Sequence, residues 1–163
     1  MSRFAIIGFG CAGYNALRAI RESGSEAEVD VYSPFPHPPA NPMLTTYYVK
    51  GKIPYEAMFP YGTAEEILAK YPCNLHSGVG ITALDAARRE LTLTTGEKKQ
   101  YDKILIATGA NAVNLPVGDI PADRIFTMRT VHDAERLKEA LDQRPIHSAL
   151  VVGASMVGIK IIE

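Results

Sequence analysis

The sequence has little of several features that mark whole classes of proteins. Its 163 residues contain only two cysteines, Cys11 and Cys73, which argues against a disulfide framework and favours a reducing compartment, the cytoplasm. No apolar run approaches the roughly 20 residues that cross a bilayer, and the opening MSRFAIIGFG is not typical of a signal peptide. The net charge is −1 with scattered basic residues, so neither nucleic acid nor an anionic membrane is an expected partner.

Groups that would form a metal or nucleophile site are also sparse. Cys73 and His76 lie close together, but no second pair of ligands accompanies them, so no metal site is expected. The sequence contains neither a nucleophile-elbow motif nor a P-loop. No catalytic residue is therefore assigned from the sequence.

The first residues predict a β-α-β unit. Residues 3–8, RFAIIG, form a short continuous apolar run, which is typical of a strand buried on both faces of a parallel sheet. A helix is expected over 11–22, with Gly24 as its C-terminal stop, and a second strand over 28–33, EVDVYS. The helix residues expected on its buried side are Ala12, Ala16, Leu17 and Ile20.

A proline-rich segment follows at 34–62. It holds seven of the eleven prolines together with several tyrosine and phenylalanine residues. Because those aromatic side chains favour burial, we expect an ordered excursion and not a flexible linker. Residues 63–71 then predict a short helix that begins with a capping box formed by Thr63 and Glu66.

The remaining residues predict three more strands, at 74–85, 90–98 and 100–110. The middle one includes an antiparallel hairpin, LTLTTGEK, and the last one includes a buried central strand, KILIATG. Residues 130–141 predict an amphipathic helix that begins at Thr130 and places four apolar residues on one face: Val131, Ala134, Leu137 and Leu141.

The glycine motif GFGCAG lies between the first predicted strand and the first predicted helix. Gly8 allows the tight turn, Gly10 lets the backbone approach a pyrophosphate, and Gly13 allows close packing of helix on strand. The helix N-terminus offers unpaired N–H groups to phosphates. Dinucleotide binding is the favoured interpretation; a glycine-rich turn in an ordinary α/β domain is the alternative.

The motif lacks one part. An acidic residue about 20 residues beyond the last glycine usually accepts bonds from the ribose hydroxyls. Ser33 stands at that place, and it is uncharged. Asp30 is close in sequence but lies inside the predicted strand, so it is an unfavourable substitute.

Three segments, taken in order, resemble one family. They are AIIGFGCAG, YDKILIATGA and ALVVGASMVG, and RIFTMRTVHDAERLK lies between the last two. Together they resemble the N-terminal portion of the FAD-dependent pyridine nucleotide–disulfide oxidoreductases, in the branch of coenzyme A-disulfide reductases, NADH oxidases and ferredoxin or rubredoxin reductases. The resemblance implies an α/β, Rossmann-like FAD/NAD(P)-binding fold in three layers, with a central parallel sheet and an antiparallel β-meander.

The resemblance also implies cofactors and domains. FAD would bind in residues 1–147, and residues 148–163 would be the truncated start of an NAD(P)H-binding domain, in which SALVVGASMVG repeats the first β-turn-α pattern with Ser155 in place of the middle glycine. The chain is accordingly expected to be a fragment of a longer enzyme. The implied cofactor-binding residues are Gly8, Gly10, Cys11, Ala12, Gly13, Ser33, Val79, Ala107, Thr108, Gly109, Arg129, Gly153 and Gly158.

The chain departs from this family in the segment after the second strand. Met43 stands where the coenzyme A-disulfide reductases carry their redox cysteine, and a thioether cannot act as a thiolate. Pro42 and Tyr47 stand where the branch without that cysteine often carries arginine and lysine. Cys73 is interpreted as structural.

The implied activity is hydride transfer from NAD(P)H to FAD and then electron transfer to an acceptor, which the sequence does not identify. Oxygen, a quinone or a small redox protein would each fit an enzyme without a cysteine at position 43. One alternative is a non-catalytic nucleotide-binding module with a degenerate flavin site, which Ser33, Pro42 and Tyr47 favour. A simple NAD-dependent dehydrogenase is a weaker alternative, because such enzymes carry a single glycine motif. Full-length relatives usually form homodimers.

Overall fold

The protein is described by a computed structural model that covers residues 1–113 and 115–162. The described chain divides into two compact units. The first contains Met1–Ala40 and Tyr61–Gly109, and the second contains Asn41–Pro60 and the residues from Ala110 onward. Among the described residues, no helix combines the length and apolar character that a membrane span needs.

The first unit is built on a four-stranded parallel sheet. Its strand order is β3-β2-β1-β7, and all three pairings are parallel. A second, antiparallel sheet has the order β4-β5-β6. The bounds are β1 Arg3–Ile7, β2 Glu28–Ser33, β3 Asn74–Ser77, β4 Ile81–Asp85, β5 Glu90–Leu93, β6 Lys98–Gln100 and β7 Lys103–Ile106.

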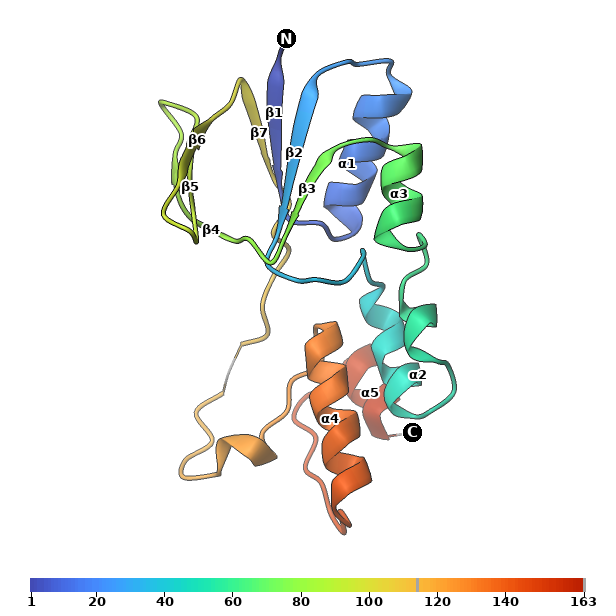
Figure 1. The fold of residues 1–163 in the computed structure, drawn as a ribbon. Helices are drawn as coiled ribbons and strands as arrows, with labels where there is room; N and C mark the ends of the chain where they lie inside the picture. The colour runs from blue at the N-terminus through green and yellow to red at the C-terminus, as the bar shows by residue number, and fades with distance from the viewer. Residues whose placement is uncertain (114, 163) are drawn as a thin grey trace. The chain divides into compact units, whose positions relative to one another are not determined.

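The two faces of the parallel sheet are covered differently. Helices α1 (Cys11–Glu22) and α3 (Ala64–Lys70) cover one face, and the antiparallel sheet covers the other (Figure 1). This arrangement confirms the predicted three-layer α/β fold with a parallel sheet and an antiparallel meander. The capping box at the start of α3 is also confirmed, since Thr63 and Glu66 each bond the other's backbone N–H.

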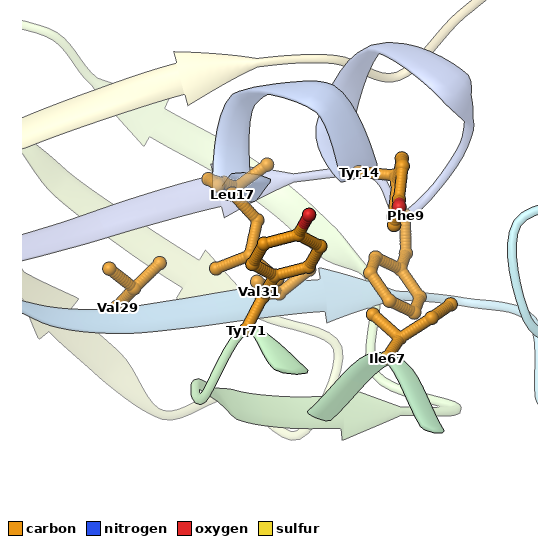
Figure 2. Packing of buried hydrophobic residues seen from close by; sticks show 8 residues of the cluster. Phe9, Tyr14, Leu17, Val29, Val31, Ile67 and Tyr71 are labelled. Atoms are coloured by element: carbon orange, nitrogen blue, oxygen red, sulfur yellow. The ribbon is translucent and has the colours of Figure 1, made fainter. Parts of the chain in front are cut away.

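Alternation along the strands divides the core in two. Ile6, Val29 and Val31 point to the helix side, where they pack with the residues drawn in Figure 2. The neighbouring residues point to the antiparallel sheet and form a second cluster of Ala5, Ile7, Tyr32, Leu91, Leu93 and Tyr101. Because β1 is covered on both faces, its sequence reads as a continuous apolar run, whereas β2 carries the buried Asp30 among its apolar residues.

The second unit is mainly helical. Helix α2 packs against both α4 and α5, and rings from the proline-rich segment pack edge to face, with centroids 5.9 Å apart for Tyr48 and Tyr55 and 5.1 Å apart for Tyr55 and Phe59. The expectation that part of this segment is ordered is therefore confirmed. The bounds are η1 Pro42–Leu44, α2 Thr45–Val49, η2 Tyr55–Met58, η3 Ala122–Arg124, α4 Val131–Gln143 and α5 Met156–Ile162.

Two strand predictions were wrong. The single strand expected over 74–85 is broken at Gly78, with φ +77°, where the chain leaves the parallel sheet and enters the antiparallel one. The strand at KILIATG was expected to be central and buried. In the described residues it forms β7 at an edge of the parallel sheet, and Leu105 is 43% and Ile106 61% exposed. A run of apolar residues indicates a strand but not the number of its covered faces.

Three other predictions also failed. Ala12 is exposed and not buried, because the close approach of Gly13 to Gly8 turns the buried side of α1 toward Gly13, Tyr14 and Leu17. Leu141 is 46% exposed on α4. The strand expected at 148–153 does not form in the described residues, because a parallel strand needs a neighbour to pair with, and Leu150 is 89% exposed.

Candidate functional site

The carboxyl ends of the parallel strands meet at the first glycine turn. Gly8 follows β1 with φ +108°, and its N–H donates to the carbonyl of Tyr32 at the end of β2 at 2.8 Å. On the other side, the N–H of Ala107 donates to the carbonyl of Ile7 at 2.8 Å. A side chain at Gly8 would overlap the carbonyl oxygen of Ala107, so glycine is required there for space as well as for φ.

The other two glycines of the motif differ in the space around them: Gly13 is crowded and Gly10 is open. A Cβ at Gly13 would overlap the carbonyl oxygen of Gly8 and would lie 3.3 Å from Cγ2 of Ile6. A Cβ at Gly10 would have no atom of the described residues within 4 Å, apart from its two sequence neighbours. Gly13 thus serves the packing of α1 on β1, whereas Gly10 leaves open space for another molecule to approach the backbone.

In the described residues, the N-terminus of α1 has neither a side-chain cap nor an acidic residue in its first turn. The N-cap is Gly10. The first helical bond runs from the N–H of Tyr14 to the carbonyl of Gly10 at 2.9 Å. Cys11 and Ala12 are exposed residues in this first turn, where backbone N–H groups have no partner within the helix and suit phosphate oxygens.

The first turn of α1 is held by an aromatic residue that the sequence analysis did not single out. The Tyr61 ring stacks on Tyr14 with centroids 4.1 Å apart, and its hydroxyl lies 3.2 Å from Cys11 Sγ. Asn15 Nδ2 donates to the carbonyl of Cys11 at 2.8 Å. The contact with Cys11 raises the pKa of Tyr61. No sequence spacing links Tyr61 to α1, so only the fold reveals this contact.

The end of β2 carries Ser33 where an acid would be expected. Its side chain is 4% exposed, accepts a bond from the N–H of Phe35 at 3.2 Å and donates to the carbonyl of Phe35 at 3.1 Å. The Ser33 carbonyl accepts from the N–H of Val79 at 3.1 Å. The fold therefore brings Ser33 and Val79 together, but the Ser33 hydroxyl is already engaged with its own turn.

Asp30 does not take the place of that acid, because its carboxylate is buried in a separate polar cluster. Oδ2 accepts from Tyr101 Oη at 2.7 Å, and Oδ1 lies 3.1 Å from His76 Nε2 and 3.0 Å from Asn74 Nδ2. Burial by itself would raise the pKa of Asp30, but these hydrogen bonds outweigh it and lower the pKa. Burial and the bonds to Tyr32 and Asp30 raise the pKa of Tyr101.

The segment after β7 lies against the first turn. Thr108 N would lie 3.2 Å from a Cβ at Gly8, and Gly109 adopts φ +71°. Both residues are exposed. The fold thus places Ala107 and Thr108 beside Gly8, and Gly109 follows them; a contact of these residues with FAD stays a prediction.

The second glycine motif has the same local geometry as the first. Gly153 has φ +107°, and a Cβ at Gly158 would overlap its carbonyl oxygen. The N–H of Ile159 donates to the carbonyl of Ser155 at 2.9 Å, which corresponds to the bond from Tyr14 to Gly10 in the first motif. The two turns are thus equivalent, even though no strand precedes the second one in the described chain.

Arg129 and Met43 belong to the second unit. Arg129 is exposed, and its Nε donates to the carbonyl of Ala110 at 3.2 Å. Met43 lies in η1 and is 52% exposed. Among the described residues, no group of three or more His, Cys, Asp or Glu side chains could hold a metal ion.

Comparison with known proteins places these features in one family. Residues 2–162 match the pyridine nucleotide-disulphide oxidoreductase family. The water-forming NADH oxidase of Lactobacillus brevis has a TM-score of 0.87 at 22% identity over 99% of this chain and 36% of that chain. Reduced CoADR-RHD of Bacillus anthracis has a TM-score of 0.87 at 21% identity, over 99% of this chain and 30% of that chain.

A further structure, the covalent putidaredoxin reductase–putidaredoxin complex, has a TM-score of 0.76 at 26% identity, over 86% of this chain and 34% of that chain. The chain thus spans about a third of the length of these solved proteins. The family match covers both glycine turns and nearly every described residue. The chain belongs to the pyridine nucleotide-disulphide oxidoreductase family.

Proposed function

We propose that this chain is the FAD-binding portion of an NAD(P)H-dependent flavoprotein oxidoreductase. The observation that carries the proposal is the first glycine turn. It leaves the N-terminus of α1 uncapped and the space over Gly10 open, at the carboxyl edge of a parallel sheet. A dinucleotide pyrophosphate is expected to bind where these features occur together. When bound, FAD would supply the chemistry of taking a hydride from NAD(P)H and passing its electrons on.

The residues of the chain would bind and orient that cofactor. Gly8 and Gly13 hold the turn closed, and the backbone of Gly10, Cys11 and Ala12 would receive the phosphates. Ser33 and Val79 lie at the adjoining strand ends, where the adenosine half would sit. The segment Ala107, Thr108 and Gly109 adjoins Gly8 on the other side. Arg129 is a further proposed contact.

The second glycine turn supports an NAD(P)H site. Gly153 and Gly158 reproduce the geometry of Gly8 and Gly13, which suits a second dinucleotide. We place the boundary between an FAD-binding part, 1–147, and the start of an NAD(P)H-binding part at residue 148. This division differs from the two compact units, which are interleaved along the chain.

The residue at position 43 bears on how electrons would leave the flavin, but it does not select the acceptor. Met43 has no thiol, so electrons would leave the flavin without a cysteine intermediate. A small redox protein is the acceptor that we favour, and the likeness to putidaredoxin reductase in complex with putidaredoxin supports it. Oxygen and quinones are the alternatives that a direct assay would separate.

One observation favours a second function, a non-catalytic nucleotide-binding module. The Ser33 hydroxyl bonds both backbone groups of Phe35, so it has little capacity left for a ribose. A chain with this defect would bind adenine nucleotides weakly and would not select the flavin.

Titration of the chain with FAD separates the two functions. The oxidoreductase proposal predicts micromolar binding, seen as a change in flavin absorbance and fluorescence. Binding of AMP or NAD without binding of FAD would instead support the module. Failure to bind any of these nucleotides would overturn both functions.

A further inference from the structure

We propose that Phe35 and His37 form an aromatic platform that stacks on the adenine base of the bound dinucleotide, in place of the missing acid at the end of β2. The proposal deepens the proposed function and rests on it. The two rings are parallel to within 11°, with their centroids 5.4 Å apart. Phe35 is 41% exposed, so part of its ring remains available to a ligand.

We call the rings of Phe35 and His37 the platform. A series of hydrogen bonds links its backbone to the first glycine turn. The N–H of Gly8 bonds the carbonyl of Tyr32, and the hydroxyl of Ser33 bonds the backbone of Phe35. The Ser33 carbonyl bonds Val79, and a Cβ at Gly80 would lie 3.9 Å from Cβ of Pro34. Pro34, the residue before Phe35, therefore lies beside Gly80 in the crossing at 78–80, where the adenosine end of the site would be.

The sequence around the rings restricts their backbone. Phe35 and His37 alternate with Pro34, Pro36 and Pro38, each of which has a fixed φ and keeps the preceding residue out of the helical region. The segment is anchored at one end by buried Ser33. At its other end, Pro39 is fully buried. Little entropy is then lost when a planar base stacks on the rings.

An aromatic platform suits this site chemically. A carboxylate would bind the ribose hydroxyls, but Ser33 is uncharged and its hydroxyl is engaged within its own turn. Stacking needs no hydrogen-bond partner, because every base presents a π face. The adenine ring is the planar group nearest to the ribose, so it is the group that the platform would receive.

The test uses etheno-ADP, a fluorescent probe with the adenine half alone, titrated into the full 163-residue chain. Phe35→Leu keeps apolar bulk but removes the ring, and it should weaken etheno-ADP binding about tenfold. Phe35→Tyr keeps the ring and should bind within about threefold of the unchanged chain. Leu84→Ala, at a residue 38% exposed on β4, is the control and should leave binding unchanged.

His37→Leu is the second variant and should weaken the same binding, because it removes the ring that holds Phe35 in place. Far-UV circular dichroism and the melting midpoint check that each variant is folded. Unchanged etheno-ADP affinity in folded Phe35→Leu would overturn the platform, even if the unchanged chain binds FAD normally. If the unchanged chain binds neither FAD nor etheno-ADP, the proposed function fails and the platform fails with it.

Discussion

The carbonyl oxygen of Gly8 occupies the volume that a side chain at Gly13 would need. Gly13→Ala should therefore push α1 away from β1 and destabilise the chain by about 1–3 kcal/mol. Urea unfolding followed by circular dichroism measures this loss. Unchanged stability in Gly13→Ala would show that the turn relaxes freely, contrary to the close packing described here.

Gly10→Ala is the matched control for that variant. It adds the same methyl group where, apart from the two sequence neighbours, no atom in the described part of the chain lies within 4 Å, and the φ of −86° suits alanine. We expect its free energy of unfolding to change by less than about 1 kcal/mol, whereas FAD affinity falls about tenfold because the methyl group occupies the approach to the backbone. Undiminished FAD binding would place the pyrophosphate elsewhere.

We expect the free energy of unfolding to fall in acid because of Asp30. Its pKa is lowered in the folded chain, so its stabilising contribution is present above the unfolded pKa of about 3.9 and is lost as pH falls through the lower folded pKa. Asp30→Asn should cost about 2–3 kcal/mol at pH 7 and should flatten the dependence of stability on pH below about 4. Denaturant unfolding between pH 7 and pH 2 checks both effects, and an unaltered pH dependence would contradict them.

Tyr101 joins two buried groups, since its hydroxyl lies 2.7 Å from Asp30 Oδ2 and 2.6 Å from Tyr32 Oη. Tyr101→Phe should destabilise the chain by about 1–3 kcal/mol, because both partners lose a buried hydrogen bond. Combined with Asp30→Asn in a double-mutant cycle, it should cost less than the sum of the two single changes. Strict additivity would mean that the two side chains act independently.

The two cysteines should react at very different rates. Burial raises the pKa of the Cys73 thiol to about 11, so almost no thiolate is present at pH 8. Cys11 is exposed on the first turn of α1. Iodoacetamide at pH 8 should therefore label Cys11 first, and peptide mass spectrometry would identify the residue. Equal labelling of both thiols in the folded chain would contradict this prediction.

The features that were predictable from the sequence are those that local residues determine. The bounds of β2 and α1, the capping box at Thr63 and the glycine turns each depend on residues within a few positions of one another. Their backbone angles and caps are set before distant segments pack, so a short pattern is sufficient to predict them.

What could not be predicted depends on distant segments. The break at Gly78 exists because the chain changes sheets, and the exposure of Ile106 depends on which strands and layers lie beside β7. The stack of Tyr61 on Tyr14 joins residues 47 positions apart, and the ring pair of Phe35 and His37 was hidden among prolines. The roles of the individual site residues, Arg129 among them, stay predictions.

The second glycine turn reaches the shape of the first although no strand precedes it in the described chain, with φ +107° at Gly153 against +108° at Gly8. Its shape therefore does not depend on a paired strand before it. A gene duplication that copied this short stretch would deliver a glycine turn already in its folded shape, and the surrounding sheet would be added later. The same property makes this stretch a candidate segment for grafting into designed α/β proteins.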